Sequence, residues 1–225
     1  MSWSLNEVQS QIASEVDQSD SPPVEGTSDW NTRLSAINRS LLDWANSNEW
    51  STLKVVHNGL ISTSTGNASY ALPVDFKKLD SYPRIMSDGL TVFEFPAVNP
   101  SKNTIYNDND RFVNILGNDR DAKVMYIHAP QLVSGASVQF TYWKSPQSLA
   151  SASDVVEVPD PTFLVQRALY YIYKGAEDGR FPEAKVESEK ILIRMIENEN
   201  SLGIAYVDRN IPNYLEQTHF RIGRD

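Results

Sequence analysis

The feature that most constrains this chain is a pair of apolar helices joined by one tight turn, predicted over residues 161–198. In the first helix, apolar side chains recur at helical spacing in two adjacent rows, Leu164, Ala168, Tyr171 and Gly175 beside Val165, Leu169, Ile172 and Ala176. The second helix carries one main row, made of Ala184, Ser188, Ile191 and Met195. Asp160 is predicted to cap the first helix and Gly179 to end it. Stripes this wide must be buried, so the rest of the chain has to supply surfaces that cover this hairpin.

An amphipathic helix is predicted close to the N-terminus, over residues 5–17. Ser4 and Glu7 have the spacing of a capping box. Apolar residues then follow at steps of three and four, which places them on one face of a helix. The proline-containing segment that comes next, up to Thr27, is predicted to be a linker.

A second helix is predicted over residues 29–47, with Ser28 or Asp29 as its cap. Its row of bulky apolar residues consists of Trp30, Leu34, Ile37, Leu41 and Trp44. This row is the natural packing partner of the C-terminal hairpin. We therefore expect the helices at 29–47, 162–177 and 183–198 to form one bundle, because each has an apolar stripe to bury.

After Trp50 the pattern changes to short segments with a period of two, separated by turn-forming clusters. Strands are predicted at residues 53–57, 69–72, 82–86, 91–95, 111–115, 123–127 and 137–143. Gly59 is predicted to turn the chain after the first of them. Strands at this spacing favour an antiparallel meander or a small sandwich.

Together these elements predict an α+β fold. A helical bundle is formed by N- and C-terminal helices, with an inserted antiparallel β-rich region and an extended C-terminal tail. The predicted parts are the N-terminal helices at 1–50, the β-rich region at 51–150, the closing hairpin at 151–200 and an assembly arm at 201–225.

The last segment, residues 201–225, is apolar but irregular. Gly203 and Pro212 are predicted to prevent it from extending the preceding helix. Its charges balance, with Arg209, Arg221 and Arg224 against Asp208, Glu216 and Asp225. A neutral, apolar segment packs either on its own body or on another chain. Aromatic and arginine side chains concentrate binding energy at interfaces, so the candidate partner-binding residues are Tyr206, Arg209, Tyr214, Phe220 and Arg221.

The charge of the chain is negative and unevenly distributed. A formal net charge of -9 argues against a general nucleic-acid binder, which would present a basic face. Residues 1–32 contain no Lys or Arg, and their acidic residues are Glu7, Glu15, Asp17, Asp20, Glu25 and Asp29. This run is interpreted either as a solvated acidic face or as a surface that avoids an anionic partner.

The sequence shows no catalytic motif, cofactor motif or metal motif. The absence of cysteine excludes disulfides and thiolate sites. The histidines His57, His128 and His219 are far apart, and residues 107–110 lack the glycine and glutamate of a calcium loop. Three carboxylates, Asp154, Glu157 and Asp160, lie at a predicted strand-to-helix junction. Capping explains Asp160 there, and we prefer this interpretation to paired carboxylates for glycoside hydrolysis. We therefore predict no enzyme activity and no cofactor. No apolar run reaches the ~18 residues of a membrane span, so no membrane association is expected.

The order of these parts resembles one known family. A Trp-rich helix is followed by Tyr70-Ala71-Leu72-Pro73-Val74-Asp75-Phe76, then by a β-rich region that ends in Val138 to Lys144, and then by the helical hairpin. This order is similar to that of the head-to-tail connector (adaptor) proteins of tailed bacteriophages, particularly of short-tailed phages. The resemblance covers residues 28–199, and it leaves out the first helix and the tail.

The motif also has a mechanical interpretation. Pro73 ends a strand ladder because it lacks an N–H donor, and Asp75 is expected to bond to nearby backbone in the turn. Tyr70, Leu72 and Phe76 are then expected to pin this turn onto the helices.

The resemblance implies a structural virion protein of the neck, assembled in the host cytoplasm. It implies a homo-oligomeric ring, commonly of twelve copies, between the portal protein and a tail or nozzle protein. DNA would pass through its central channel, and an acidic lining would let the duplex slide. C-terminal segments of the family often reach along the portal, a role that fits residues 201–225.

Two other classes of function remain open. One is another tail, baseplate or fibre-attachment component of the same kind of particle. The other is an independent glycan-binding β-module, for which exposed aromatic residues such as Trp143 or Tyr106 would be the platform.

Overall fold

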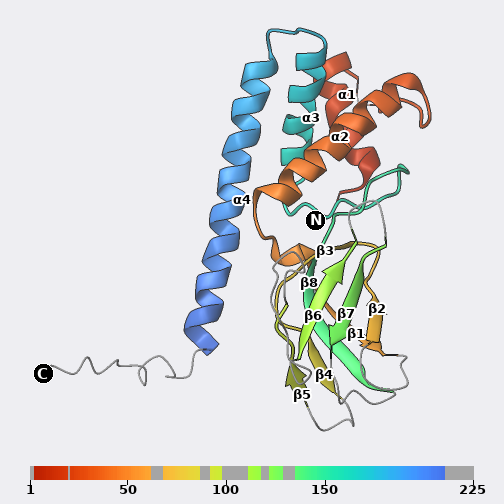
Figure 1. Cartoon of the computed structure of the whole chain (residues 1–225). Helices are drawn as coiled ribbons and strands as arrows, with labels where there is room; N and C mark the ends of the chain where they lie inside the picture. Colours follow the sequence, from red (N-terminus) through yellow and green to blue (C-terminus); the bar gives the residue numbers. More distant parts are fainter. Residues whose placement is uncertain are drawn as a thin grey trace, which may run out of the picture. The chain divides into compact units, whose positions relative to one another are not determined.

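The computed structural model describes residues 3–19, 21–61, 68–86, 92–97, 111–117, 122–128 and 135–210, without the side chains of 92–93 and 202–210. The chain divides into two compact units. The helical unit comprises residues 1–48 and 148–225, and the β unit comprises residues 49–147. Within the described residues, four α-helices and antiparallel sheets confirm the predicted α+β class (Figure 1).

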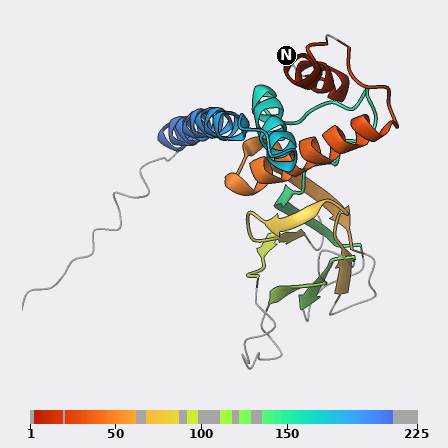
Figure 2. The ribbon, with the colours of Figure 1, turned by 90° about the horizontal axis from the view of Figure 1, so that it is seen from above.

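The helical unit is built around one central helix. Its elements are α1 (Leu5–Asp17), α2 (Ser28–Ser47), α3 (Thr162–Gly175) and α4 (Phe181–Asn210). Helix α3 packs against each of the other three. Within this unit, α1 and α4 lie on opposite sides of α3 (Figure 2). The bundle therefore includes α1 in addition to α2, α3 and α4, the three helices that were predicted to form it.

The helix starts follow their local sequence closely. At α1 the predicted capping box is present: Ser4 Oγ accepts from the Glu7 N–H at 3.3 Å, and Glu7 Oε2 accepts from the Ser4 N–H at 2.6 Å. The cap of α2 is Thr27, not Ser28 or Asp29, because its Oγ1 is the atom that accepts from the Trp30 N–H. At α3 the Asp160 carboxylate accepts from the first-turn N–H of Thr162, as predicted.

Helix α4 is longer than the sequence pattern indicated. It was expected to end near residue 198, but its backbone continues through Gly203 to Asn210. The prediction that Gly203 stops the helix is therefore wrong. A glycine inside a helix costs only about 1 kcal/mol relative to alanine. Pro212 follows shortly after the observed end, where a proline disfavours helical backbone in the residue before it.

The β unit contains two antiparallel sheets. Its strands are β1 (Lys54–Leu60), β2 (Ala68–Ala71), β3 (Phe76–Leu79), β4 (Arg84–Met86), β5 (Val92–Glu94), β6 (Phe112–Leu116), β7 (Val124–His128) and β8 (Ser137–Lys144). One sheet has the order β1-β8-β4-β5, with β3 also paired to β8, and the other has the order β2-β7-β6. Strand β8 thus joins three partners and organises the larger sheet.

Two features of this unit differ from the sequence prediction. Strand β3 was not expected, yet its residues pair with β8 after a register shift between Phe76 and Lys78. Gly59 does not turn the chain but lies inside β1. A larger residue would not fit there, because a Cβ at this position would come within 1.8 Å of Tyr70 Oη. The glycine makes room for that phenol, a known reason for glycine inside a strand.

An aromatic cluster forms the core of the β unit. Phe140 lies at its centre. The distance from the Phe140 ring centroid is 5.1 Å to His57, 6.3 Å to Tyr70, 6.4 Å to Phe76 and 5.8 Å to Tyr142. The expectation that Tyr70, Leu72 and Phe76 pin a turn onto the helices is wrong, since they pack in this core.

Asp75 is likewise used differently from the prediction. Its carboxylate accepts a hydrogen bond from the hydroxyl of Tyr142 at 2.9 Å, instead of bonding to the backbone of the turn. The proline-containing motif therefore fixes a strand connection inside the β unit.

Candidate functional site

A cluster of arginine, lysine and tyrosine side chains gathers on one side of α3. Two of its members, Arg39 and Asp43, come from α2, and Arg167, Tyr170, Tyr171 and Lys174 come from α3. We call these six residues the Arg/Tyr patch. The pairs 39/43, 167/171 and 170/174 are each four residues apart, so each pair lies on one face of its helix. Packing of α2 on α3 brings the two faces together.

Asp43 organises the middle of the patch. Its Oδ2 accepts from Arg167 Nε at 2.8 Å and also from the hydroxyl of Tyr171. The side chains of Arg167 and Asp43 are 20% and 32% exposed, so solvent screens this pair only partly. A hydrogen bond to a charged group contributes about 1.5–3 kcal/mol when it is well shielded, and this one fixes α2 against α3.

The cations of the patch lie over its aromatic rings. The guanidinium carbon of Arg39 is 4.1 Å from the centroid of Tyr171. That of Arg167 is 5.1 Å from Tyr170 and 5.4 Å from Tyr171. The ammonium of Lys174 is 5.5 Å from the Tyr170 ring. Cation–π geometry holds these side chains in place at the surface.

Cations outnumber acids in the patch, with Arg39, Arg167 and Lys174 against Asp43. Lys174 donates a hydrogen bond to the Tyr170 hydroxyl at 3.2 Å, and this bond, with the charges of Lys174, Arg167 and Lys185, lowers the pKa of Tyr170. Burial opposes the charge of Arg167, but the hydrogen bond and charge of Asp43 outweigh it and raise the Arg167 pKa. The pKa of Tyr171 shifts the opposite way to that of Tyr170, because burial and its hydrogen bond to Asp43 raise it.

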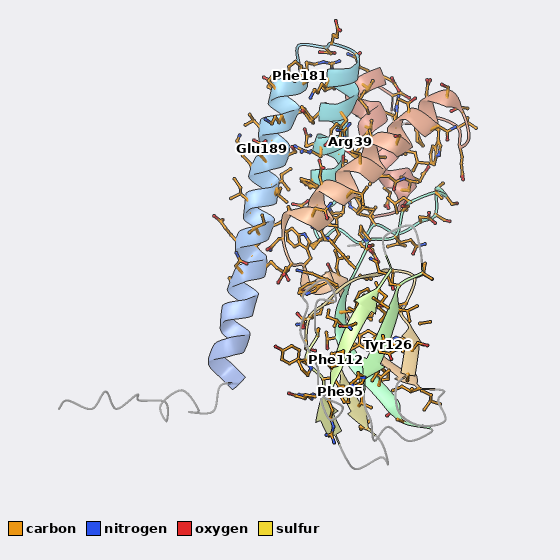
Figure 3. All side chains as sticks on the ribbon, in the orientation of Figure 1. Arg39, Phe95, Phe112, Tyr126, Phe181 and Glu189 are labelled. Atoms are coloured by element: carbon orange, nitrogen blue, oxygen red, sulfur yellow. The ribbon has the colours of Figure 1, made fainter. Side chains whose placement is uncertain are left out.

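Helix α4 borders the patch through Lys185. This lysine forms an ion pair with Glu189 at 3.6 Å, one turn further along α4. Figure 3 labels Arg39 and Glu189, which come from the two helices that flank α3. The patch thus has a floor made by α3 and borders made by α2 and α4.

The acidic run of the sequence lies elsewhere in the same unit. Its described members sit on α1, in the α1–α2 connection and in the first turn of α2, at Glu7, Glu15, Asp17, Glu25 and Asp29. Glu7 is used in the capping box and Asp17 pairs with Arg33. Glu15, Glu25 and Asp29 are exposed, and we call these three the acidic surface.

The partner-binding residues predicted from sequence are not brought together by the described part of the chain. Tyr206 and Arg209 lie in the last turns of α4, where only the backbone is described. Tyr214, Phe220 and Arg221 lie outside the described residues. Their role stays a prediction.

The histidines that were considered for chemistry have structural surroundings. His57 Nε2 lies 2.6 Å from the Tyr70 hydroxyl, and His128 stacks on Phe112 with centroids 4.8 Å apart. His219 and the segment 107–110 lie outside the described residues. Among the residues that are described, no group of three acidic or histidine side chains could hold a metal ion.

The carboxylates near the start of α3 also act within the fold. Asp154 accepts from the backbone N–H groups of Ala150 and Ser151, and bonds from Ser151 and Ala150 lower its pKa. Asp160 accepts from Thr162 and pairs with Arg194 at 3.4 Å.

Trp143 is not the exposed aromatic platform that a glycan-binding module would need. It is 8% exposed, and the ammonium groups of Lys54 and Lys78 lie 5.5 and 5.8 Å from its ring. Tyr106, the other platform candidate, lies outside the described residues.

Comparison with protein-family models gives a match over most of the chain. A protein-family model with the description SU10 adaptor protein matches residues 4–197, and no curated protein matches the chain. The matched range includes α1, which lay outside the resemblance seen in the sequence. Within the described residues, no helix is long and apolar enough to cross a membrane.

Proposed function

Since the chain belongs to the SU10 adaptor protein family, we propose that this bacteriophage structural protein connects the head of the virion to its tail. The match over residues 4–197 carries the proposal, because it covers the β unit and the helical unit through most of α4. In this role the protein forms a ring, commonly of twelve copies, between the portal protein and a tail or nozzle protein. It has no catalytic step to perform.

The ring encloses a channel through which DNA passes. The formal net charge of -9 supports this part of the proposal. A duplex with one charge per ≈ 1.7 Å binds strongly to basic surfaces, whereas an acidic wall repels it and lets it slide. Passage of DNA therefore requires no sequence-specific contact.

Residues 201–225 act as an assembly arm in this proposal. Tyr206, Arg209, Tyr214, Phe220 and Arg221 are its binding residues. The arm binds the portal or a neighbouring copy, and ordering it on binding costs entropy. Many weak arms acting together offset that cost.

The proposal is tested by mixing the purified chain with portal rings of the same phage. We expect a larger particle by sedimentation velocity, and electron microscopy should show a second ring stacked coaxially on the portal. A matched control uses the portal of an unrelated phage. Failure of the chain to join its own portal, while both proteins remain folded, would contradict the connector role.

A further inference from the structure

We propose that the Arg/Tyr patch of one copy binds the acidic surface of the next copy around the ring. This inference rests on the proposed ring and names the surfaces that build it. The partner is a second copy of this chain, and the contact joins two different parts of the helical unit.

The patch has cations that its own unit leaves without carboxylate partners. Asp43, its one acid, is already bonded to Arg167 and Tyr171. Arg39 and Lys174 are exposed, and neither forms an ion pair with a carboxylate among the described residues. Tyrosine and arginine are the residues that most often dominate protein interfaces, and here their side chains are held in position before any partner arrives.

The acidic surface has the complementary excess. Residues 1–32 contain no Lys or Arg. In the part of the chain that the structure describes, Glu25 and Asp29 are exposed and form no ion pair. Complementary potentials of this kind set the register and speed of association.

The two surfaces lie at different places along α2. Glu25 precedes this helix and Asp29 is in its first turn, whereas Arg39 lies ten residues after Asp29, about 15 Å along the axis at 1.5 Å per residue. In a ring, each copy offers its patch to one neighbour and its acidic surface to the other. Such a head-to-tail contact forms a ring where its rotation closes, and an open filament where it does not.

This assignment changes the interpretation of the acidic run. From the sequence, residues 1–32 were interpreted either as a solvated acidic face or as a surface that avoids an anionic partner such as DNA in the channel. In the proposed contact Glu25 and Asp29 are covered by the next copy, so the channel is lined by other acidic residues.

A charge-swap experiment tests the contact. The patch variant carries Arg39→Glu and Lys174→Glu, and the acid variant carries Glu25→Lys and Asp29→Lys. Each variant alone should lose self-association by at least about tenfold, because like charges then face each other. Mixed in equal amounts, the two variants should assemble again with alternating copies, since every contact in the mixture pairs opposite charges.

Assembly is measured by sedimentation velocity and native mass spectrometry of the full-length chain, alone and with portal. A matched control carries Lys77→Glu and Lys190→Glu, two exposed side chains outside the patch, with the same change in net charge as the patch variant. It should assemble like the wild type. Melting temperatures of all variants verify that each is folded.

The outcomes separate this inference from the connector role. If the wild type forms rings and both variants do so equally well, the contact is wrong and the ring proposal stands. If both variants fail alone and their mixture also fails, the pairing of these two surfaces is wrong. If the wild type stays monomeric both alone and with its portal, the proposed function itself fails.

Discussion

The helical unit and the β unit both contain aromatic clusters, but the clusters differ in what surrounds them. In the β unit, Phe140 and Phe76 pack with Tyr142 inside the fold, away from solvent. In the helical unit, Tyr170 and Tyr171 lie beneath arginine and lysine side chains at the surface. The same residue type holds sheets together in one unit and supports cations in the other.

The acids that serve the two clusters show the same contrast. Asp75 accepts a hydrogen bond from the buried Tyr142, and this contact lies within the β unit. Asp43 binds Arg167 and Tyr171 at a half-exposed position and leaves Arg39 facing solvent. Among the described residues, the aspartate of the β unit therefore closes an internal contact, whereas that of the helical unit leaves an arginine at the surface.

The largest expected effect breaks the helical unit at one buried position. Leu41 is 2% exposed and its neighbour Leu42 is 52% exposed, both on α2. Leu41→Asp buries an unpaired charge and should destabilise the fold by more than the about 2–5 kcal/mol that leucine-to-alanine changes cost. Leu42→Asp should change the stability by less than about 0.5 kcal/mol. Denaturant unfolding measures both, and equal stability of the two variants would contradict the bundle.

The next effect concerns the aromatic core of the β unit. Phe140→Ala removes the ring that touches His57, Tyr70, Phe76 and Tyr142. A cost of about 3–5 kcal/mol is expected for a buried phenylalanine. Val56→Ala is the control, because this side chain on the neighbouring β1 is exposed. Hydrogen exchange should show the loss of protection in the β-unit amides. Loss confined to the helices would contradict the assignment of Phe140 to the core of the β unit.

Much of the fold could be predicted from sequence because its signals are local. The capping box at Ser4 and the rows of α2 and α3 depend on spacing alone, and spacing is visible in one chain. Strand β3 was missed because a register shift after Phe76 interrupts its alternation. The prediction of a turn at Gly59 was wrong because the glycine is required by the side chain of Tyr70, which lies on another strand.

The candidate site was harder to predict because it depends on how two distant helices meet. Tyr171 was assigned to a buried apolar row, and its half-buried ring fits that assignment. Its bond to Asp43 depends on the register between α2 and α3, which local periodicity does not encode. The pairs Arg39/Asp43 and Arg167/Tyr171 were visible in the sequence, because polar side chains four residues apart lie on one face of a helix. Two such faces form one network when their helices pack together.

A smaller effect tests the buried phenol of the β unit. Burial, followed by the hydrogen bond and the charge of Asp75, raises the pKa of Tyr142 to about 12. Tyr142→Phe should cost about 1 kcal/mol at neutral pH for the lost hydrogen bond.

The pH dependence of this variant gives its sharper test. An unfolded tyrosine ionises near pH 10, whereas the folded Tyr142 keeps its proton to about pH 12. The stabilising contribution is therefore complete below pH 10 and is lost as the pH rises toward 12. The wild type should lose stability relative to Tyr142→Phe across this window. Parallel stability curves for the two proteins would show that Tyr142 is not held as described.

The smallest expected effect on stability comes from ending the chain at Asn200. Helix α3 has 14 residues and α4 has 30, which correspond to about 21 Å and about 45 Å at 1.5 Å per residue. About half of α4 therefore extends beyond the length of its partner. Met195 is the last buried side chain among those described in α4. Removal of residues 201–225 should leave the melting temperature within about 2 °C of the wild type.

The same truncated chain should fail to join the portal, because it lacks the proposed arm. A full-length control replaces the arm's binding residues with serine, at Tyr206, Arg209, Tyr214, Phe220 and Arg221. It should fail in the same way if side chains carry the contact, since the backbone is then still present. If the truncated chain unfolds, the segment belongs to the core of its own helical unit. If it binds portal with wild-type affinity, the arm is not an assembly element, and the contacts that join the ring to the portal lie within residues 1–200.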